Sequence, residues 1–244
     1  MPCLQLRVER VCDIYVGSDN PIAQRVRPVA TKYREKLADL IKRLLSAKNI
    51  QPSILPWASP IVVIIKKKGE DIRLCIDYRK MNQLTRLTIY SIPMIRKLLQ
   101  DLDKAMWYCF LDIAKGFWVV EMTERSRAIS AFVTPSGLFK WLRMPFRLKN
   151  ASQIYQRLID NSLYEYLKIG PKPYSSTTPS STPTNVFTDG VPDTDPRPSV
   201  LGRRSYIDDS LISATSWTSF YRRVERLLEV FDEWNLSISV IKSF

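Results

Sequence analysis

Two adjacent aspartates, Asp208 and Asp209, follow Tyr206 and Ile207 where the flanking residues predict the turn of a β-hairpin. Strand-like segments lie on both sides, at residues 204–207 and 210–213. Two like charges on one tight turn stay ionised most readily when a bound cation neutralises them. The motif therefore predicts a cation site. The alternative is a surface β-turn, where aspartate is common in any case.

A third carboxylate, Asp112, ends the apolar segment that begins at Trp107. A charge there is costly without a partner, although an aspartate that caps the following turn is the alternative. The order strand, helix, hairpin suits a βαββ unit whose adjacent strands bring Asp112 to Asp208. Three aspartates in a chain without histidine indicate a hard divalent cation with oxygen ligands. Two such ions about 4 Å apart could activate a 3′-hydroxyl and stabilise a leaving pyrophosphate.

The composition favours a polyanionic partner. The 244 residues include 37 Lys+Arg and 24 Asp+Glu, which gives a net charge of +13 and a pI near 9.7. Such an excess of positive charge suits nucleic acid or an anionic membrane surface. The absence of histidine excludes Ser-His-Asp and Cys-His catalysis and removes the commonest zinc ligand.

Several features predict an intracellular, cytoplasmic protein. The sequence has no run of about 18 apolar residues, so we expect no membrane span and no membrane partner. The first residues lack the apolar centre of a signal peptide. The cysteines form no CxxC pair, so we expect free thiols in a reducing compartment rather than a disulfide framework. The four cysteines are Cys3, Cys12, Cys75 and Cys109.

Apolar spacing predicts amphipathic helices over residues 31–49, with Thr31 as the N-cap, over 153–169 and over 217–236. The last helix is predicted to turn inward Tyr221, Val224, Leu227, Leu228, Phe231 and Trp234. β-Branched segments at 61–65 and 72–76 predict a hairpin with a basic tip. Two interpretations of the tip stay open: a solvated loop, or a hairpin end whose lysines contact a triphosphate. Residues 171–198 hold 7 of the 16 prolines and predict a long flexible insertion.

An ordered series of motifs carries a family resemblance. The motifs stand at residues 56–62 (PWASPIV), 73–82 (RLCIDYRKMN), 111–117 (LDIAKGF), 131–139 (AFVTPSGLF), 144–146 (MPF), 150–151 (NA), 155–157 (YQR) and 206–209 (YIDD). The chain resembles the reverse transcriptase of gypsy-like long-terminal-repeat retrotransposons over nearly all of residues 20–244. The resemblance implies an α+β fold, with the fingers and palm of a right-hand polymerase and a ferredoxin-like βαββ palm.

The same resemblance implies roles for the carboxylates. Asp112 and Asp208 would coordinate two Mg²⁺ ions, for which Mn²⁺ could substitute. Asp209 would be a third, less directly bound carboxylate, and the carbonyl of Ile113 would complete a metal shell.

Other residues would handle the nucleotide, again as the resemblance implies. Lys66 and Arg73 would grip the β- and γ-phosphates. Phe117 would exclude a 2′-hydroxyl by steric contact, and Phe146 would lie beside the incoming nucleotide. Lys242 would protonate pyrophosphate. The alternatives are that the two phenylalanines are core aromatics and that Lys242 is a surface lysine.

The chain departs from the family pattern at four places, one of which is the insertion at residues 171–198. Arg147 stands where the family has glycine, and its side chain would either obstruct the site or swing out and add a phosphate contact. Ser152 replaces the proline of the family's Asn-Ala-Pro, a milder change. The sequence ends at Phe244, before the family's primer-gripping hairpin and thumb, so we expect it to hold a duplex poorly. The family's protease, ribonuclease H and integrase neighbours are also absent from it.

Together these features predict the fingers and palm of an RNA-directed DNA polymerase that binds an RNA template, a DNA or RNA primer and deoxynucleoside triphosphates. A virus-like particle is a second expected location. The predicted division is an N-terminal linker and helix (1–45), fingers (46–87 and 121–152) and palm (88–120 and 153–244). Two alternatives stay open: a catalytically inactive nucleic-acid-binding remnant, and a basic scaffold in which Asp112 lies far from Asp208.

Overall fold

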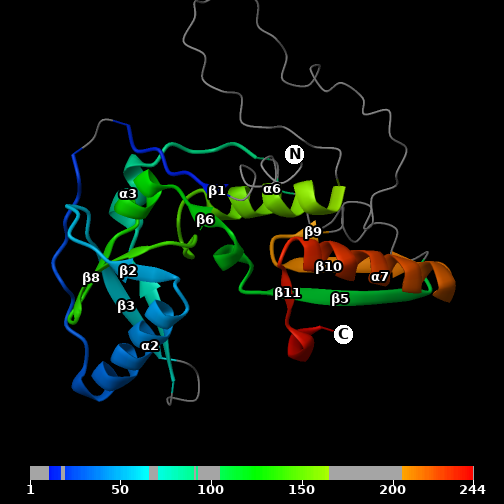
Figure 1. Ribbon diagram of the computed structural model, residues 1–244, viewed down its shortest axis with the longest axis horizontal. Helices are drawn as coiled ribbons and strands as arrows, with labels where there is room; N and C mark the ends of the chain where they lie inside the picture. The colour runs from blue at the N-terminus through cyan, green and yellow to red at the C-terminus, as the bar shows by residue number, and fades with distance from the viewer. Residues whose placement is uncertain are drawn as a thin grey trace, which may run out of the picture.

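The computed structural model describes residues 11–17, 20–65, 71–90, 92, 105–164 and 205–243. The described residues form three β-sheets, and the two larger ones lie side by side, each flanked by helices (Figure 1). A five-stranded sheet contains strands from residues 50–76 and 132–141, and a four-stranded sheet contains strands from 107–114 and 205–238. The predicted insertion at 171–198 lies outside the described residues.

The five-stranded sheet has the order β2 (Ile50–Pro52), β8 (Gly137–Trp141), β7 (Phe132–Thr134), β3 (Ser59–Ile65) and β4 (Ile72–Ile76). β3 and β4 pair antiparallel over their whole length, from Ile61 opposite Ile76 to Ile65 opposite Ile72. The predicted hairpin is therefore confirmed, because β-branched residues suit the pleated, half-buried surface. Its tip, with Lys66, lies outside the described residues.

Helix α2 (Arg34–Ser46) packs on this sheet through the apolar positions Leu37, Ile41 and Leu44, as the 3-4 spacing predicts. The predicted N-cap at Thr31 is wrong. A 3₁₀ turn, η1 (Thr31–Tyr33), precedes the helix, and neither element has a side-chain cap hydrogen bond. By contrast, α5 (Glu124–Ile129) is capped by Thr123, whose hydroxyl accepts a bond from the amide of Ser126. A short helix, α3 (Arg79–Leu84), follows β4.

The four-stranded sheet has the order β11 (Ser237–Ile238), β5 (Trp107–Ala114), β10 (Asp209–Ala214), β9 (Ser205–Tyr206). Helix α6 (Ala151–Tyr164) precedes the β9–β10 hairpin in chain order, and strands β7 and β8 of the five-stranded sheet lie between β5 and α6 in the sequence. Helix α7 (Trp217–Glu233) connects β10 to β11. The order βαββαβ with these neighbours is the ferredoxin-like arrangement. The predicted fold class, α+β with a ferredoxin-like palm, is therefore confirmed. Two 3₁₀ turns, η3 (Gly116–Val119) and η4 (Val240–Lys242), follow β5 and β11.

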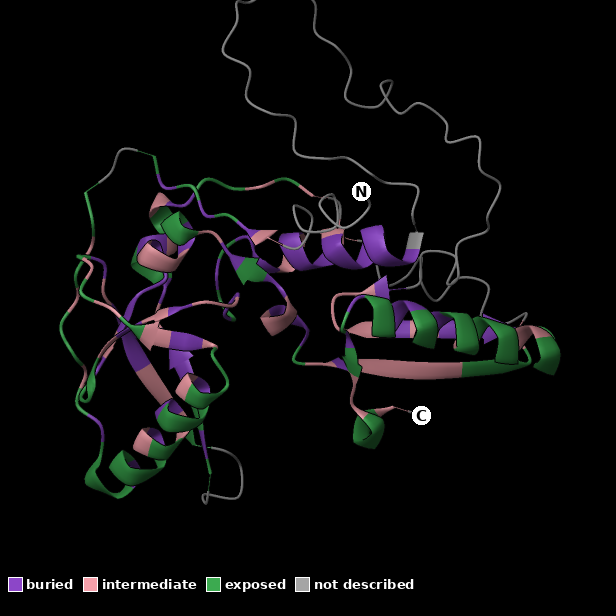
Figure 2. Ribbon diagram, in the orientation of Figure 1, coloured by how far each residue is buried: buried purple, intermediate pink, exposed green. Residues whose placement is uncertain are grey.

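Helices α6 and α7 lie together over the four-stranded sheet, and α6 is buried along most of its length, whereas the outer face of α7 is exposed (Figure 2). Two of the residues predicted to face inward on α7 do not: Tyr221 and Leu228 are exposed. Phe220, Val224 and Leu227 instead form the stripe against the core. Tyr221 and Leu228 lie one position further along the helix, which turns them about 100° away from that stripe.

Residues 11–16 are more regular than the predicted N-terminal linker implied. β1 (Val11–Cys12) pairs parallel with β6 (Glu121–Met122), and the alternating residues Cys12, Ile14 and Val16 are buried. The amide of Ile14 donates to Ser126 Oγ at 2.6 Å. A period-two alternation over only five residues in a basic segment was too short a signal to predict this strand.

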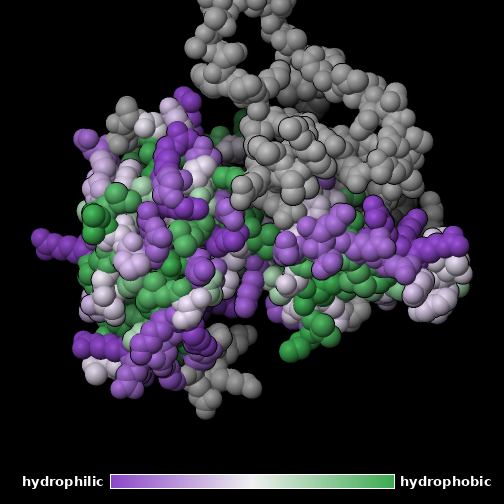
Figure 3. Space-filling model, viewed as in Figure 1, coloured by the Kyte–Doolittle hydropathy of each residue, from purple (hydrophilic) through white to green (hydrophobic). Residues whose placement is uncertain are grey.

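On the side shown in Figure 3, hydrophilic side chains cover the outer faces of α2 and α7, and hydrophobic side chains are visible between these faces. Within the described part of the chain, no helix has the length and apolar character needed to cross a bilayer. The described cysteines, Cys12, Cys75 and Cys109, are free thiols.

Candidate active site

The aspartates meet at one end of the paired strands β5 and β10. Asp209, the first residue of β10, is the register partner of Asp112 on β5, and it also pairs with Tyr206 on β9. The carbonyl of Asp208 accepts a hydrogen bond of 2.7 Å from the amide of Ile113. Asp112 does not end its strand as predicted, because pairing of Ile113 and Ala114 with β11 extends β5 by two residues.

The turn that carries the aspartates is held in an uncommon backbone conformation. It has two residues, Ile207 and Asp208, and the φ of Ile207 is 52°. Hairpin turns of this length usually place glycine or asparagine at positive φ, and a β-branched residue there is strained. The fully buried Gln156 of α6 braces the turn: its Oε1 accepts from the amide of Ile207 at 2.8 Å and its Nε2 donates to the carbonyl of Ser205 at 3.3 Å.

Three carboxylates lie close enough at this turn to interact electrostatically. Burial, together with the carboxylates of Asp112 and Asp209, raises the pKa of Asp208 to about 6. Burial and Asp112 also raise the pKa of Asp209. Oδ1 of Asp208 is buried and has no hydrogen-bond partner. An unpaired buried carboxylate oxygen is costly, so the folded chain holds this group where a cation would relieve it.

We predict that Asp208→Asn raises the stability of the metal-free protein at pH 7. The folded pKa of Asp208 lies above its ordinary value of 3.8, so the stability linked to its protonation is present below pH 4 and lost as the pH rises through about 6. Asparagine does not titrate, so the gain in melting temperature over wild type should shrink between pH 7 and pH 4. The exposed Asp39→Asn on α2 is the control. A gain that is independent of pH would contradict this prediction.

Lys242 of η4 points its ammonium at the site. Its Nζ lies 3.1 Å from Oδ2 and 3.4 Å from Oδ1 of Asp112, and the amide of Asp112 donates to Ser243 Oγ at 3.2 Å. The side chain of Lys242 is 67% exposed, so this ion pair stabilises the fold only weakly. Lys242 therefore neutralises a carboxylate to which the family resemblance gives a metal-binding role.

We predict that Lys242→Gln binds Mn²⁺ about threefold more tightly than wild type, because an exposed counter-charge worth roughly 0.5–1 kcal/mol no longer competes for Asp112. Binding can be followed by electron paramagnetic resonance of the metal in the absence of nucleotide. Lys42→Gln, on the outer face of α2, is the matched control. An unchanged or weaker affinity in Lys242→Gln would show that the ion pair does not compete with the cation.

Two of the predicted nucleotide-handling residues lie together near the aspartates. Phe117, in η3 just after β5, is 6% exposed, and its ring centroid is 5.0 Å from that of Phe146, which is 50% exposed. Arg73 lies on β4 of the other sheet, opposite Ile64, with its side chain exposed. The structure therefore does not bring Arg73 to the carboxylates.

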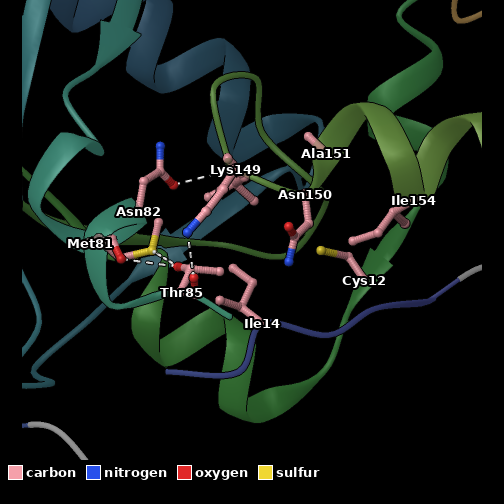
Figure 4. Close-up of a pocket in the computed structure, with 10 residues that line it drawn as sticks. Cys12, Ile14, Met81, Asn82, Thr85, Lys149, Asn150, Ala151 and Ile154 are labelled. Carbon is pink, nitrogen blue, oxygen red and sulfur yellow. Dashed lines mark hydrogen bonds between the residues drawn. The ribbon is translucent and has the colours of Figure 1, made fainter. Parts of the chain in front are cut away.

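Arg147 lies in a loop that Asn82 of α3 holds in place. The amide group of Asn82 donates to the carbonyl of Arg147 at 2.9 Å and accepts from the amide of Lys149 at 3.0 Å. Lys149 Nζ donates to the carbonyl of Thr85 (Figure 4). The φ of Arg147 is 71°, which explains why glycine suits this position, and its side chain is exposed rather than turned into the core.

We predict that Arg147→Gly stabilises the protein by about 1 kcal/mol, a rise in melting temperature of about 2–4 °C, because glycine adopts positive φ without strain. Arg147→Ala is the control, since it removes the charge but keeps the Cβ atom, and it should not stabilise. Thermal unfolding of both variants separates the two causes. An equal gain in both would assign the effect to charge rather than backbone.

The other departure from the family pattern, Ser152, lies in the first turn of α6. The first turn tolerates proline because its amides have no partner within the helix. Serine and proline both fit this position, so the change is mild, as its chemistry suggested.

Two residues of the site were not assigned a role from the sequence. Gln156 and Tyr155 belong to a motif that we recognised, but nothing in the sequence indicated that Gln156 braces the turn. The structure marks both residues by their burial: each polar side chain is 0% exposed on the inner side of α6.

The donor set fits a hard divalent cation, although no cage is preformed. Among the residues that the structure describes, no three carboxylate, cysteine or histidine side chains converge to enclose an ion. Mg²⁺ ordinarily binds through one or two carboxylates and takes its other ligands from water and substrate phosphates. The unpartnered Oδ1 of Asp208 and the neighbouring Asp112 are oxygen donors of that kind.

The two larger sheets, with the aspartates at the β5–β10 pair, have the fold of a right-hand nucleic-acid polymerase. The family model described as reverse transcriptase (RNA-dependent DNA polymerase) matches residues 65–244, and the chain belongs to this family. The family's members are nucleotidyltransferases that generally use divalent metal ions.

Curated relatives are polyproteins of mobile elements. The chain is 36% identical over 149 residues to the retrovirus-related Pol polyprotein from transposon 297 of Drosophila melanogaster, a match that covers 59% of this chain and 14% of that protein. It is 28% identical over 235 residues to the corresponding polyprotein from transposon opus of the same species, covering 95% of this chain and 20% of the relative. The chain thus spans a fifth or less of the length of these two relatives.

Solved structures of the same fold include the prototype foamy virus protease–reverse transcriptase. One crystal structure of it superposes with a TM-score of 0.74 at 20% identity and covers 95% of this chain and 26% of that one. Another, of the foamy viral enzyme in complex with an RNA/DNA hybrid, has a TM-score of 0.72 at 20% identity and covers 94% of this chain and 26% of that one.

Proposed function

We propose that this chain is the fingers and palm of an RNA-directed DNA polymerase of a retrotransposon, which adds deoxynucleotides to the 3′-hydroxyl of a DNA or RNA primer paired with an RNA template. The observation that carries the proposal is the register that sets Asp209 opposite Asp112, with the unpartnered Oδ1 of Asp208 beside them. The net charge of +13 suits a nucleic-acid partner. The foamy virus enzyme, which shares the fold, has been solved with an RNA/DNA hybrid.

In this proposal Asp112 and Asp208 hold Mg²⁺, for which Mn²⁺ can substitute, with Asp209 and the carbonyl of Ile113 as further oxygen donors. Bound there, the metal would activate the primer hydroxyl and neutralise charge on the leaving pyrophosphate. The protein's own contribution is to hold the carboxylates close at a braced turn, so that little reorganisation is needed when substrate arrives. Lys242, now paired with Asp112, would be free to move to the pyrophosphate once a cation binds.

The remaining roles concern the nucleotide. Phe117 excludes a 2′-hydroxyl, and the exposed Phe146 lies beside the base or sugar; the contact between their rings supports a joint role. Arg73 grips the triphosphate after the fingers sheet approaches the palm, together with Lys66, which lies outside the described residues.

The domain assignment is part of the proposal. Strands β2, β3, β4, β7 and β8 would belong to the fingers, at 46–87 and 121–152, and the four-stranded sheet to the palm, at 88–120 and 153–244. We further propose an intracellular, cytoplasmic location or a virus-like particle, and protease, ribonuclease H and integrase regions as polyprotein neighbours, as the Pol polyprotein relatives suggest.

The other two candidate functions differ in their support. An inactive nucleic-acid-binding remnant is favoured by one observation, the ion pair that places a lysine on Asp112. A basic scaffold required Asp112 to lie far from Asp208, whereas the amide of Ile113 contacts the carbonyl of Asp208 at 2.7 Å.

Extension of a labelled DNA primer on an RNA template tests the proposal. The full chain is incubated with deoxynucleoside triphosphates and Mg²⁺ or Mn²⁺, and binding of the same primer–template is measured by fluorescence anisotropy. We expect metal-dependent extension. Binding without any extension would contradict the proposal and identify the chain as a remnant, and salt-sensitive binding with no preference for a primer–template would identify it as a scaffold.

A further inference from the structure

Three aromatic rings connect the surface of the site to the core beneath it. Phe146 is half-exposed, Phe117 below it is buried, and Tyr155 of α6 lies deepest, at 0% exposure. The ring centroids of Phe117 and Tyr155 are 5.0 Å apart, with planes only 24° from parallel. Tyr155 therefore lies beneath the two phenylalanines that would contact the nucleotide.

The hydroxyl of Tyr155 has no role in stabilising the fold. Its oxygen is buried and has no hydrogen-bond partner, a state that costs about 1–3 kcal/mol. The backbone of Gly116 packs directly over it, since a Cβ atom at residue 116 would lie 2.0 Å from the hydroxyl oxygen. Phenylalanine would fill the same space with the same ring contacts and without an unsatisfied group.

A second buried oxygen without a partner is Oδ1 of Asp208. Burial and the negative charge of Asp208 both raise the pKa of Tyr155, so the phenol stays protonated and can donate to a carboxylate. A neutral donor and an unsatisfied carboxylate oxygen are complementary. Both groups belong to the same end of β5, since the hydroxyl of Tyr155 lies against Gly116 and the carbonyl of Asp208 accepts from the amide of Ile113.

We propose that Tyr155 is a positioning residue for Asp208, whose carboxylate its hydroxyl orients by a hydrogen bond, directly or through one water, when Asp208 holds a divalent cation. This inference rests on the proposed function, because it takes Asp208 as a metal ligand. Partners that orient a metal-binding carboxylate typically change metal affinity by 10–100-fold. Without the cation, the hydroxyl of Tyr155 has no hydrogen-bond partner.

The test compares Tyr155→Phe with Tyr78→Phe. Tyr78 is almost as deeply buried, at 1% exposed, but it lies between β4 and α3, and its hydroxyl donates to the carbonyl of Ser130 at 2.7 Å. Thermal unfolding is measured without metal, and Mn²⁺ affinity is measured by electron paramagnetic resonance with a deoxynucleoside triphosphate present. Neither readout requires polymerase activity.

We expect Tyr155→Phe to unfold at or above the wild-type temperature and to bind Mn²⁺ about tenfold more weakly. Tyr78→Phe should show the opposite pattern, with a lower unfolding temperature and wild-type Mn²⁺ affinity. Wild-type Mn²⁺ affinity in Tyr155→Phe, or a loss of stability like that of Tyr78→Phe, would overturn the inference while leaving the proposed function standing. Failure of the wild-type chain to bind Mn²⁺ at all would overturn both.

Discussion

Asp112→Asn is expected to slow primer extension at least about a thousandfold, the largest effect of any single substitution considered. Asparagine keeps the shape of the side chain but loses the charge and one of the oxygen donors. Asp112 is the register partner of Asp209, and the next residue, Ile113, donates its amide hydrogen to the carbonyl of Asp208. The substitution therefore removes one of the carboxylates of the proposed cation site. Rates are measured as single-nucleotide incorporation under enzyme excess, which separates chemistry from poor retention of the duplex.

Two controls accompany this variant. Asp39→Asn, an exposed aspartate on α2, should extend the primer at the wild-type rate. Affinity for primer–template should change little in Asp112→Asn, because removal of a negative charge does not weaken contacts with phosphates. Extension by Asp112→Asn within tenfold of wild type would mean that this carboxylate is not a metal ligand.

Gln156→Leu is expected to destabilise the protein by about 1–3 kcal/mol, since it removes three hydrogen bonds and leaves the amide of Ile207 without its side-chain partner. The amide of Ile207, the carbonyl of Ser205 and the carboxylate of Asp160 all bond to Gln156. The volume of the side chain is nearly preserved, so the loss reports hydrogen bonding rather than a cavity. Release of the strained Ile207 should also lower extension activity, because the aspartates would no longer be held at a fixed turn.

Gln153→Leu provides the matched control for this loss. Gln153 lies one turn earlier on α6, and its Oε1 is buried without a hydrogen-bond partner. Replacing it should therefore be close to neutral. Urea unfolding, with unchanged dependence on denaturant, measures both variants. An equal loss in the two would show that the cost arises from placing leucine on α6 rather than from the turn.

Much of the fold could be predicted from the sequence where periodicity is local and strong. The β-branched segments of the β3–β4 hairpin and the 3-4 apolar spacing of α2 are signals of that kind. The strand β1 and the packing of Tyr221 could not be predicted, because they depend on which distant surface the segment meets. The predicted start of α2 was wrong for a similar reason, since a 3₁₀ turn stands where the N-cap was expected.

The candidate site, like the fold, could be predicted from the sequence only in part. The types and order of Asp112, Asp208 and Asp209 indicated oxygen-ligand chemistry, but the register that sets Asp112 opposite Asp209 is a long-range pairing that no local pattern encodes. The ion pair between Lys242 and Asp112 and the brace from Gln156 likewise arise from tertiary contacts. Positive φ at Arg147 had a sequence signal, the replacement of the family's glycine, and the backbone explains it.

Whether Asp112, Asp208 and Asp209 form one divalent-cation site is decided by the affinity of the full chain for Mn²⁺ in the presence of a non-hydrolysable deoxynucleoside triphosphate, measured by electron paramagnetic resonance. Wild type, Asp208→Asn and the exposed Asp39→Asn are compared at one ionic strength. We predict that Asp208→Asn binds Mn²⁺ at least tenfold more weakly than the other two. Equal affinity in all three proteins would contradict a metal site at this turn.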